Sequence, residues 1–116
     1  MFEVRKRFRF EAAHSLPHLP DGHKCKRLHG HSYAVDVCVR GELDDRGFVV
    51  DYAEISAATD PIIQRLDHQN INDLLDCLST AENLARWIYE ELRSTGLPVA
   101  QVMVYETPTT CCVYPI

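Results

Sequence analysis

The sequence lacks the features typical of membrane proteins, exported proteins and nucleic-acid-binding proteins. Its first ten residues, MFEVRKRFRF, carry charges throughout and contain no long apolar run, so we expect neither a signal peptide nor a membrane anchor. The formal net charge of -5 argues against non-specific binding to DNA or RNA, which depends on clustered lysine and arginine. We therefore expect a cytoplasmic protein with no nucleic-acid or membrane partner.

Paired cysteines are also missing. The five cysteines are an odd number without paired spacing, so we expect reduced thiols instead of a disulfide framework. Three of them fall in apolar, strand-like segments and are expected to be small buried packing residues: Cys38, Cys111 and Cys112. Cys25 differs because Lys24 and Lys26 flank it, and positive surroundings favour the reactive thiolate.

The size and composition are those of an ordinary globular domain. With 116 residues, 46% hydrophobic and 25% charged, the chain is expected to form a single domain over residues 1–116. Most of its positive charge lies in the first quarter of the sequence, at Arg5, Lys6, Arg7, Arg9, Lys24, Lys26 and Arg27. This clustering fits either a basic pocket for a small anion or a solvated, charged strand face.

Two segments alternate apolar and polar residues with the period of a half-buried β-strand. In residues 2–14, FEVRKRFRFEAAH, the phenylalanines and His14 share one face, and the arginines take the other. In residues 29–41, HGHSYAVDVCVRG, His29 and His31 head the apolar face of a second strand. The intervening segment is rich in proline and glycine and is expected to be a loop.

A helix is expected after the second strand. Asp51 is a suitable cap, Glu54 stands three residues later as in a capping box, and apolar residues recur at helical spacing to Leu66. Pro61 lies inside this pattern, so we expect one helix with a kink. Just before it, FVV at residues 48–50 is expected to be a short edge strand.

The rest of the chain predicts a second helix and two more strands. The helix is expected to be capped at Ser79, with Glu82 at the matching position, and to stop at Gly96. The segments QVMVYETP and CCVYPI then have the composition of short strands. The order ββααββ, without strict alternation, favours an α+β fold: a four-stranded antiparallel sheet with both helices on one face.

Three histidines are expected to meet at one end of this sheet. Residues two apart on a strand point to the same side, so His29 and His31 can bind one ion, and antiparallel pairing would bring His14 beside them. Three neutral imidazoles with no fourth protein ligand are typical of catalytic zinc sites, which leave one position for water or substrate. The alternatives are a structural site with Cys25 as fourth ligand, and ordinary half-buried histidines without a metal.

Two further features carry groups suited to proton transfer or ligand binding. Asp67 precedes His68, and a carboxylate beside an imidazole can stabilise its charged form; the alternative is a turn carboxylate next to a solvated histidine. A thiol such as Cys25, paired with a histidine that a carboxylate orients, is a known arrangement for proton transfer. Glu106 ends an apolar strand, where it is either exposed or partly buried and able to accept two N–H bonds from a guanidine-like or pterin ring.

Together the motifs resemble a known family. FEAAHSLP, CKRLHGHSY, LDHQNIN, STAENLARWIYEEL and VYETPTT follow one another as in the 6-pyruvoyl-tetrahydropterin synthase superfamily, over nearly the whole chain. The three residues between Cys25 and the HGH motif are most similar to the bacterial 6-carboxy-tetrahydropterin synthase branch. The resemblance implies the tunnelling fold (T-fold), in which the sheets of several subunits join into a barrel with active sites between subunits, in a homohexamer built as a dimer of trimers.

The resemblance also implies a role for each candidate residue. It implies one Zn²⁺ per subunit on His14, His29 and His31; a catalytic triad of Cys25, Asp67 and His68; and a pterin anchor at Glu106 and Thr107. The implied reaction is a zinc-dependent lyase step toward queuosine, a tRNA modification, and related 7-deazaguanines. It converts 7,8-dihydroneopterin triphosphate to 6-carboxy-5,6,7,8-tetrahydropterin with release of acetaldehyde and triphosphate. The basic N-terminal residues would hold the triphosphate.

Two alternative functions stay open. The same zinc and pterin anchors would serve formation of 6-pyruvoyl-tetrahydropterin or side-chain cleavage of a related pterin. A non-catalytic zinc- or pterin-binding module is an alternative of another class. The presence of Cys25, Asp67 and His68 together argues against such a module, because binding alone needs none of them.

Overall fold

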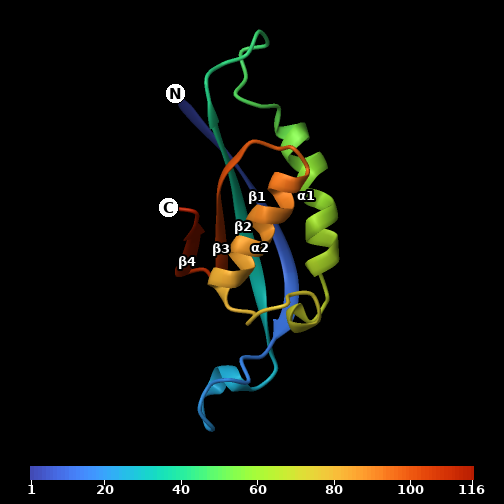
Figure 1. Ribbon diagram of the computed structural model, residues 1–116, viewed down its shortest axis with the longest axis vertical. Coiled ribbons are helices and arrows are strands. Elements are labelled where there is room, and N and C mark those ends of the chain that lie inside the picture. Colours follow the sequence, from blue (N-terminus) through green and yellow to red (C-terminus); the bar gives the residue numbers. More distant parts are fainter.

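A four-stranded antiparallel sheet with two helices on one face makes up the fold, as the sequence predicts. The computed structural model describes residues 1–116. The strands lie side by side in the order β1-β2-β3-β4, and the helices cover one side of them (Figure 1). The elements are β1 (Phe2–His14), η1 (Lys24–Lys26), β2 (His29–Gly41), α1 (Tyr52–Leu66), η2 (Ile71–Asp73), α2 (Ala81–Ser94), β3 (Val99–Thr107) and β4 (Thr110–Tyr114), where η marks a 3₁₀ turn.

The register of the first two strands determines where the histidines meet. β1 and β2 pair antiparallel from one end to the other, with Phe2 opposite Gly41 and His14 opposite His29. His31 lies opposite Ala12, two residues along on the same face. The end of β1 and the start of β2 therefore bring all three imidazoles to one end of the sheet.

The hydrophobic core lies between the sheet and the helices. α2 packs on β3 and β4, whereas α1 packs on β1. The amphipathic pattern expected from the sequence is confirmed, because the residues of the two helical stripes and of the inner strand faces are buried together: Val35, Val37, Val39, Ile55, Ile62, Leu66, Leu84, Ile88, Leu92, Val102 and Val104. This packing holds the start of α2 against the end of the sheet that carries the histidines.

The face of the sheet without helices is covered in part by its own arginines. Asp36, in the middle of β2, is buried and accepts two hydrogen bonds from the guanidinium of Arg7, at 2.6 and 2.9 Å. The same guanidinium lies 4.7 Å from the centre of the Tyr105 ring. Arg7 thereby compensates the buried carboxylate while its guanidinium lies over the Tyr105 ring.

α1 begins as expected. The Asp51 side chain accepts a hydrogen bond from the Ala53 N–H at 2.8 Å, and a single helix continues through Pro61 to Leu66. The side chain of Glu54 does not complete a capping box, because its carboxylate accepts from Arg46 at 3.1 Å instead.

The expected edge strand at residues 48–50 is wrong. The backbone N–H of Asp44 donates to the Phe48 carbonyl at 2.7 Å, and the Asp44 carboxylate accepts from the Phe48 N–H at 3.1 Å. This turn uses the backbone groups of Phe48 that a strand partner would need, and Val50 then enters the core.

The expected cap at Ser79 is also wrong by one residue. Thr80 caps α2, and its hydroxyl accepts from the Asn83 N–H at 3.2 Å. Ser79 is buried, and both its carbonyl and its hydroxyl lie within hydrogen-bond distance of the His14 ring. Ser79 therefore belongs to the histidine cluster instead of to the helix terminus.

The cysteines follow the expectation only in part. All five are free thiols, and Cys38 is buried as expected. Cys112 is half-buried against the core, but Cys111 is exposed, which contradicts its expected packing role. β4 is a short edge strand, and Cys111 lies on the face that no helix covers.

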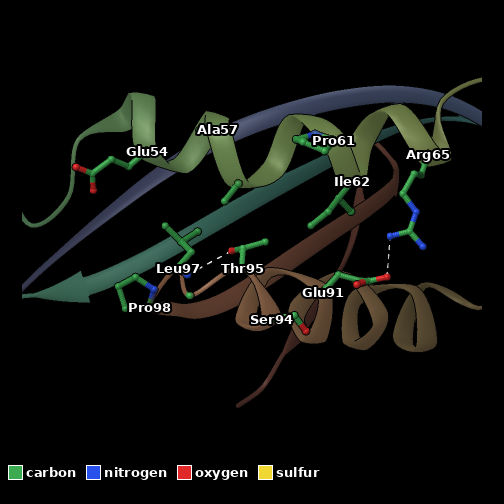
Figure 2. A pocket seen from close by; sticks show the side chains of 12 residues that line it. Glu54, Ala57, Pro61, Ile62, Arg65, Glu91, Ser94, Thr95, Leu97 and Pro98 are labelled. Carbon is green, nitrogen blue, oxygen red and sulfur yellow. Dashed lines mark hydrogen bonds and ion pairs between the residues drawn. The ribbon is translucent and has the colours of Figure 1, made fainter.

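A groove of about 680 Å³ runs between α1 and α2, away from the histidines. Figure 2 shows Arg65 and Glu91 facing each other across it, joined by a hydrogen bond of 2.8 Å. None of the candidate site residues lines this groove. Neither helix has the length and apolar character needed to cross a membrane.

Candidate metal centre and active site

His14, His29 and His31 form a compact cluster. Their ring centroids are 4.5 to 5.2 Å apart, and one nitrogen of each ring lies within 4.8 Å of the others. His14 is buried, whereas His29 and His31 are half-buried at the end of the sheet. The cluster expected from strand parity is therefore present, and it does not include Cys25.

Backbone carbonyls orient two of the three imidazoles. The Nδ1–H of His14 donates to the Ser79 carbonyl at 2.7 Å, and the Nδ1–H of His29 donates to the Arg27 carbonyl at 2.7 Å. Because a carbonyl can only accept, Nδ1 carries the proton in each neutral ring, and Nε2 keeps its lone pair. Such outer hydrogen bonds are the usual way in which proteins orient histidine ligands of a metal.

Two of the three imidazoles have a buried Nε2 atom without a partner in the chain. The Nε2 atoms of His14 and His31 are both buried without a hydrogen bond, which is uncommon for polar atoms in a folded protein. Burial, together with the neighbouring His14 and His29, lowers the pKa of His31 despite the nearby Glu106 carboxylate. Neutral imidazoles with unpaired nitrogens fit a divalent metal ion such as zinc.

Glu106 lies beside the histidines at the end of β3. One of its carboxylate oxygens is 4.0 Å from His31 Nε2, and its side chain is 26% exposed. This partial burial next to an imidazole confirms that Glu106 is not a fully solvated residue at the strand end. Its oxygens are free to accept hydrogen bonds from a ligand, because no donor in the chain bonds to them.

Asp67 and His68 form a pair at the outer edge of β1. The His68 Nδ1 lies 3.0 Å from an oxygen of Asp67, and the other oxygen of Asp67 accepts from the Glu11 N–H at 2.9 Å. These hydrogen bonds, with the one from the Glu11 backbone first, lower the pKa of Asp67. The expected carboxylate–imidazole pair is thus present, with the His68 ring exposed.

The backbone of His68 adopts an unusual conformation that this edge contact stabilises. Its φ of 59° lies in the left-handed region, which costs a non-glycine residue about 1 kcal/mol or more. The His68 N–H donates to the Glu11 carbonyl at 2.6 Å, and the next residue accepts from Ala13. Strained backbone of this kind is often found at functional sites.

Cys25 does not meet the Asp67–His68 pair within one chain. It lies in η1, where its backbone N–H donates to His23 and its carbonyl accepts from Leu16. Its half-buried thiol forms no hydrogen bond with any residue of the chain. A single chain therefore positions the two halves of the expected triad separately.

Thr107 lies on the other face of β3 from Glu106. Its hydroxyl is 2.7 Å from that of Thr110, and it lines a cavity of about 160 Å³ that Arg7 and Arg9 also line. Arg9 has no ion-pair partner, in contrast to Arg7, which binds Asp36. Among the seven basic residues of the first quarter, most are already paired or hydrogen-bonded; Arg9, Lys24 and Arg27 are not.

Two residues at this site escaped the sequence analysis. The Ser79 carbonyl orients His14, and no side-chain pattern can reveal a contact that the backbone makes. Tyr33 packs against the His31 ring, with centroids 5.4 Å apart, and its hydroxyl is buried without a partner. Burial, with a smaller effect of Glu106, raises the pKa of Tyr33, so its phenol keeps its proton. Tyr33 lies on the same face of β2 as His29 and His31, because the three residues are two positions apart, and this spacing could have predicted its place at the site.

Comparison with known proteins places the chain in a family. The 6-pyruvoyl tetrahydropterin synthase profile matches residues 3–115. The chain belongs to this family. A solved structure of the 6-pyruvoyl tetrahydropterin synthase from Caenorhabditis elegans is similar to it throughout, with a TM-score of 0.89, 29% identity, and coverage of 99% of this chain and 95% of that one.

Other members of the 6-pyruvoyl tetrahydropterin synthase family differ in the activity that their names state. A protein from Synechocystis sp. named 6-carboxy-5,6,7,8-tetrahydropterin synthase is 40% identical, over 98% of this chain and 93% of its own length. A Pyrococcus furiosus protein named dihydroneopterin monophosphate aldolase is 36% identical, over 78% of this chain and 77% of its own. Family membership therefore leaves the reaction to be argued from the site.

Proposed function

We propose that this chain is a zinc-dependent 6-carboxy-tetrahydropterin synthase, a cytoplasmic lyase of the queuosine pathway. It would convert 7,8-dihydroneopterin triphosphate to 6-carboxy-5,6,7,8-tetrahydropterin with release of acetaldehyde and triphosphate. The observation that carries the proposal is the three-histidine cluster, in which the buried Nε2 atoms of His14 and His31 lack partners and His31 lies beside the Glu106 carboxylate. The similarity to the Synechocystis protein supports this reaction over its alternatives.

His14, His29 and His31 would hold one Zn²⁺ per subunit through their Nε2 atoms. The carbonyl partners of His14 and His29 support this role, because they leave those atoms unprotonated. When bound, zinc supplies Lewis-acid chemistry at the side-chain oxygens of the pterin. The absence of a fourth protein ligand from the cluster agrees with an open position for substrate.

Asp67, His68 and Cys25 would move protons. Asp67 holds one ring nitrogen of His68 at 3.0 Å, so that the other, exposed nitrogen can exchange a proton with the substrate side chain. The thiol of Cys25 would exchange a proton on the opposite side of the substrate side chain. Because no contact within the chain joins Cys25 to this pair, we place the complete triad between neighbouring subunits.

The form of the sheet supports such an assembly. β1 and β4 are both edges, and one face of the sheet carries no helix (Figure 1). Residues 67–70 already cover the outer edge of β1 near Glu11 and Ala13, but the rest of that edge is free for pairing. Sheets of several subunits joined into a barrel, in a homohexamer formed by two trimers, would remove the exposed edges.

Glu106 would anchor the pterin by accepting two N–H bonds from its guanidine-like edge. Glu106→Gln removes the charge and replaces one acceptor with a donor, at nearly constant shape. We expect pterin affinity to fall about tenfold or more, the size of a hydrogen bond to a charged group. Zinc content should stay the same, because the histidines are unchanged.

Titration calorimetry with zinc-loaded protein measures this effect. Glu90→Gln is the matched control, because Glu90 is exposed on α2 and forms no hydrogen bond through its side chain. Equal pterin affinity in Glu106→Gln and in this control would remove Glu106 as the anchor.

The test of the reaction is product identification. Zinc-loaded protein is incubated with 7,8-dihydroneopterin triphosphate under reducing, anaerobic conditions, and the products are identified by mass spectrometry. We expect 6-carboxy-tetrahydropterin and acetaldehyde. A 6-pyruvoyl product, or a pterin whose side chain is merely cleaved as the name of the Pyrococcus furiosus relative suggests, would replace the proposed reaction with another one at the same site. No turnover with zinc and pterin bound would favour a binding module.

A further inference from the structure

Tyr33 carries a buried hydroxyl group that has no partner. Only 1% of the residue is exposed, and the phenol oxygen forms no hydrogen bond. Leaving a buried polar group unpaired lowers the stability of the folded chain. A phenylalanine would fill the same space without this cost, so the hydroxyl requires an explanation outside the stability of the free chain.

The ring of Tyr33 is held rigidly between β1 and the histidines. It stacks on Phe10 at a centroid distance of 4.8 Å, with only 7° between the ring planes. Its edge contacts are with His31 at 5.4 Å and His14 at 6.2 Å. The ring therefore has a fixed position beside the candidate metal ligands, and its buried hydroxyl cannot turn away into solvent.

Glu106 is the carboxylate that faces this ring. The register of β2 and β3 pairs Ala34 with Tyr105. Continuing this antiparallel register sets Tyr33, the residue before Ala34, opposite Glu106, the residue after Tyr105, on the helix-covered side. Burial and, to a smaller extent, the charge of Glu106 raise the pKa of Tyr33, and the Glu106 side chain is partly exposed. In the free chain, water can solvate the carboxylate on its open side.

We propose that Tyr33 is a positioning residue for the pterin anchor: its hydroxyl donates a hydrogen bond to the Glu106 carboxylate when the pterin binds. This inference rests on the proposed function of Glu106. A carboxylate has about four lone-pair sites, so it can accept two N–H bonds from the pterin and one O–H bond from Tyr33. The third bond keeps the carboxylate in the plane that the two N–H groups need.

Ligand binding supplies the reason for this bond to form. The pterin displaces water from Glu106, and a desolvated carboxylate is costly unless donors replace that water. A donor fixed in advance by stacking loses little conformational freedom when it pairs. The unpaired hydroxyl thus lowers the stability of the free protein and strengthens the binding of the pterin.

Tyr33→Phe separates these two effects. We expect neopterin, a fully oxidised pterin used as a probe without turnover, to bind zinc-loaded Tyr33→Phe about tenfold more weakly than wild type. The thermal midpoint of the ligand-free variant should be equal to or higher than that of wild type, because an unpaired polar group is removed. Tyr89→Phe, the same change on α2, is the control and should leave neopterin affinity unchanged.

A double-mutant cycle tests whether Tyr33 acts through Glu106. Tyr33→Phe should weaken neopterin binding in wild type but have almost no further effect in Glu106→Gln. Additive losses would overturn the inference, as would equal affinity of wild type and Tyr33→Phe, or a lower midpoint for Tyr33→Phe than for Tyr89→Phe. If the zinc-loaded wild type does not bind neopterin at all, the proposed function is wrong, and the role of Tyr33 with it.

Discussion

His31→Ala should abolish stoichiometric zinc binding. Two imidazoles hold zinc far more weakly than three, and the remaining rings, His14 and His29, would leave two coordination positions without protein ligands. Elemental analysis after desalting should give about one zinc per wild-type chain and less than about a tenth of that for the variant. Turnover should fall to background in the same preparation.

The variant should still fold, which makes the result interpretable. The His31 ring is half-buried and forms no hydrogen bond within the chain, so its removal leaves no partner unpaired. Zinc should raise the thermal midpoint of the wild type, since a ligand that binds only the native state stabilises it, and should not raise that of His31→Ala. His18→Ala, at an exposed histidine of the loop, is the matched control. Full zinc content in a folded His31→Ala protein would show that the ligand set is wrong.

Cys25→Ala should keep zinc and the fold but lose most turnover. General acid–base groups contribute roughly 100-fold to 10,000-fold to a rate, and we expect kcat to fall within this range. The thiol has no hydrogen-bond partner in the chain and lies outside the histidine cluster, so neither stability nor zinc content should change much. The measurements are steady-state kinetics, elemental analysis and a thermal melt on one preparation.

A cysteine elsewhere in the chain provides the control. Cys77→Ala removes an exposed thiol between η2 and α2 and should retain wild-type kcat. Full activity in Cys25→Ala would end the proton-transfer role. Loss of zinc from Cys25→Ala would instead indicate that the thiol is a fourth, structural ligand.

Mixed assemblies test whether the triad is shared between subunits. If Cys25 and His68 of one site come from different chains, inactive Cys25→Ala and His68→Ala chains that assemble together should recover activity. Random mixing would leave roughly a quarter of the sites with both intact residues. Native mass spectrometry shows whether the assemblies contain both variants. If mixed assemblies recover almost no activity, Cys25 and His68 of one site come from the same chain.

Local patterns predicted most of the fold and the three-histidine cluster. The alternation in β1 and β2 places His14, His29 and His31 on one face, and this holds for any antiparallel pairing that aligns their ends. Asp51 capped its helix because the cap depends on residues two or three positions away. The error at residues 48–50 arose because a turn between Asp44 and Phe48 competed with strand pairing, and the error at Ser79 arose from a contact with the distant His14.

The contacts at the site depend on residues far apart in the sequence. His14 and Ser79 are 65 positions apart, and the packing of α2 on the sheet brings the Ser79 carbonyl to 2.7 Å from the imidazole. The same packing commits Ser79 to the site and leaves the cap to Thr80. A periodic pattern in the sequence cannot predict this contact, because it shows which face of a strand or helix a residue lies on but not how far apart two elements pack.

The sequence by itself determined the element order, the faces and the set of chemical groups, because strand and helix periods are local properties of the chain. The tertiary structure decided which of the other groups meet. It left the Tyr33 hydroxyl buried near the histidine cluster without a partner, and it formed no hydrogen bond between Cys25 and the Asp67–His68 pair. These outcomes depend on strand register and on how the helices pack, where the energy of many buried side chains outweighs the preference of any single residue.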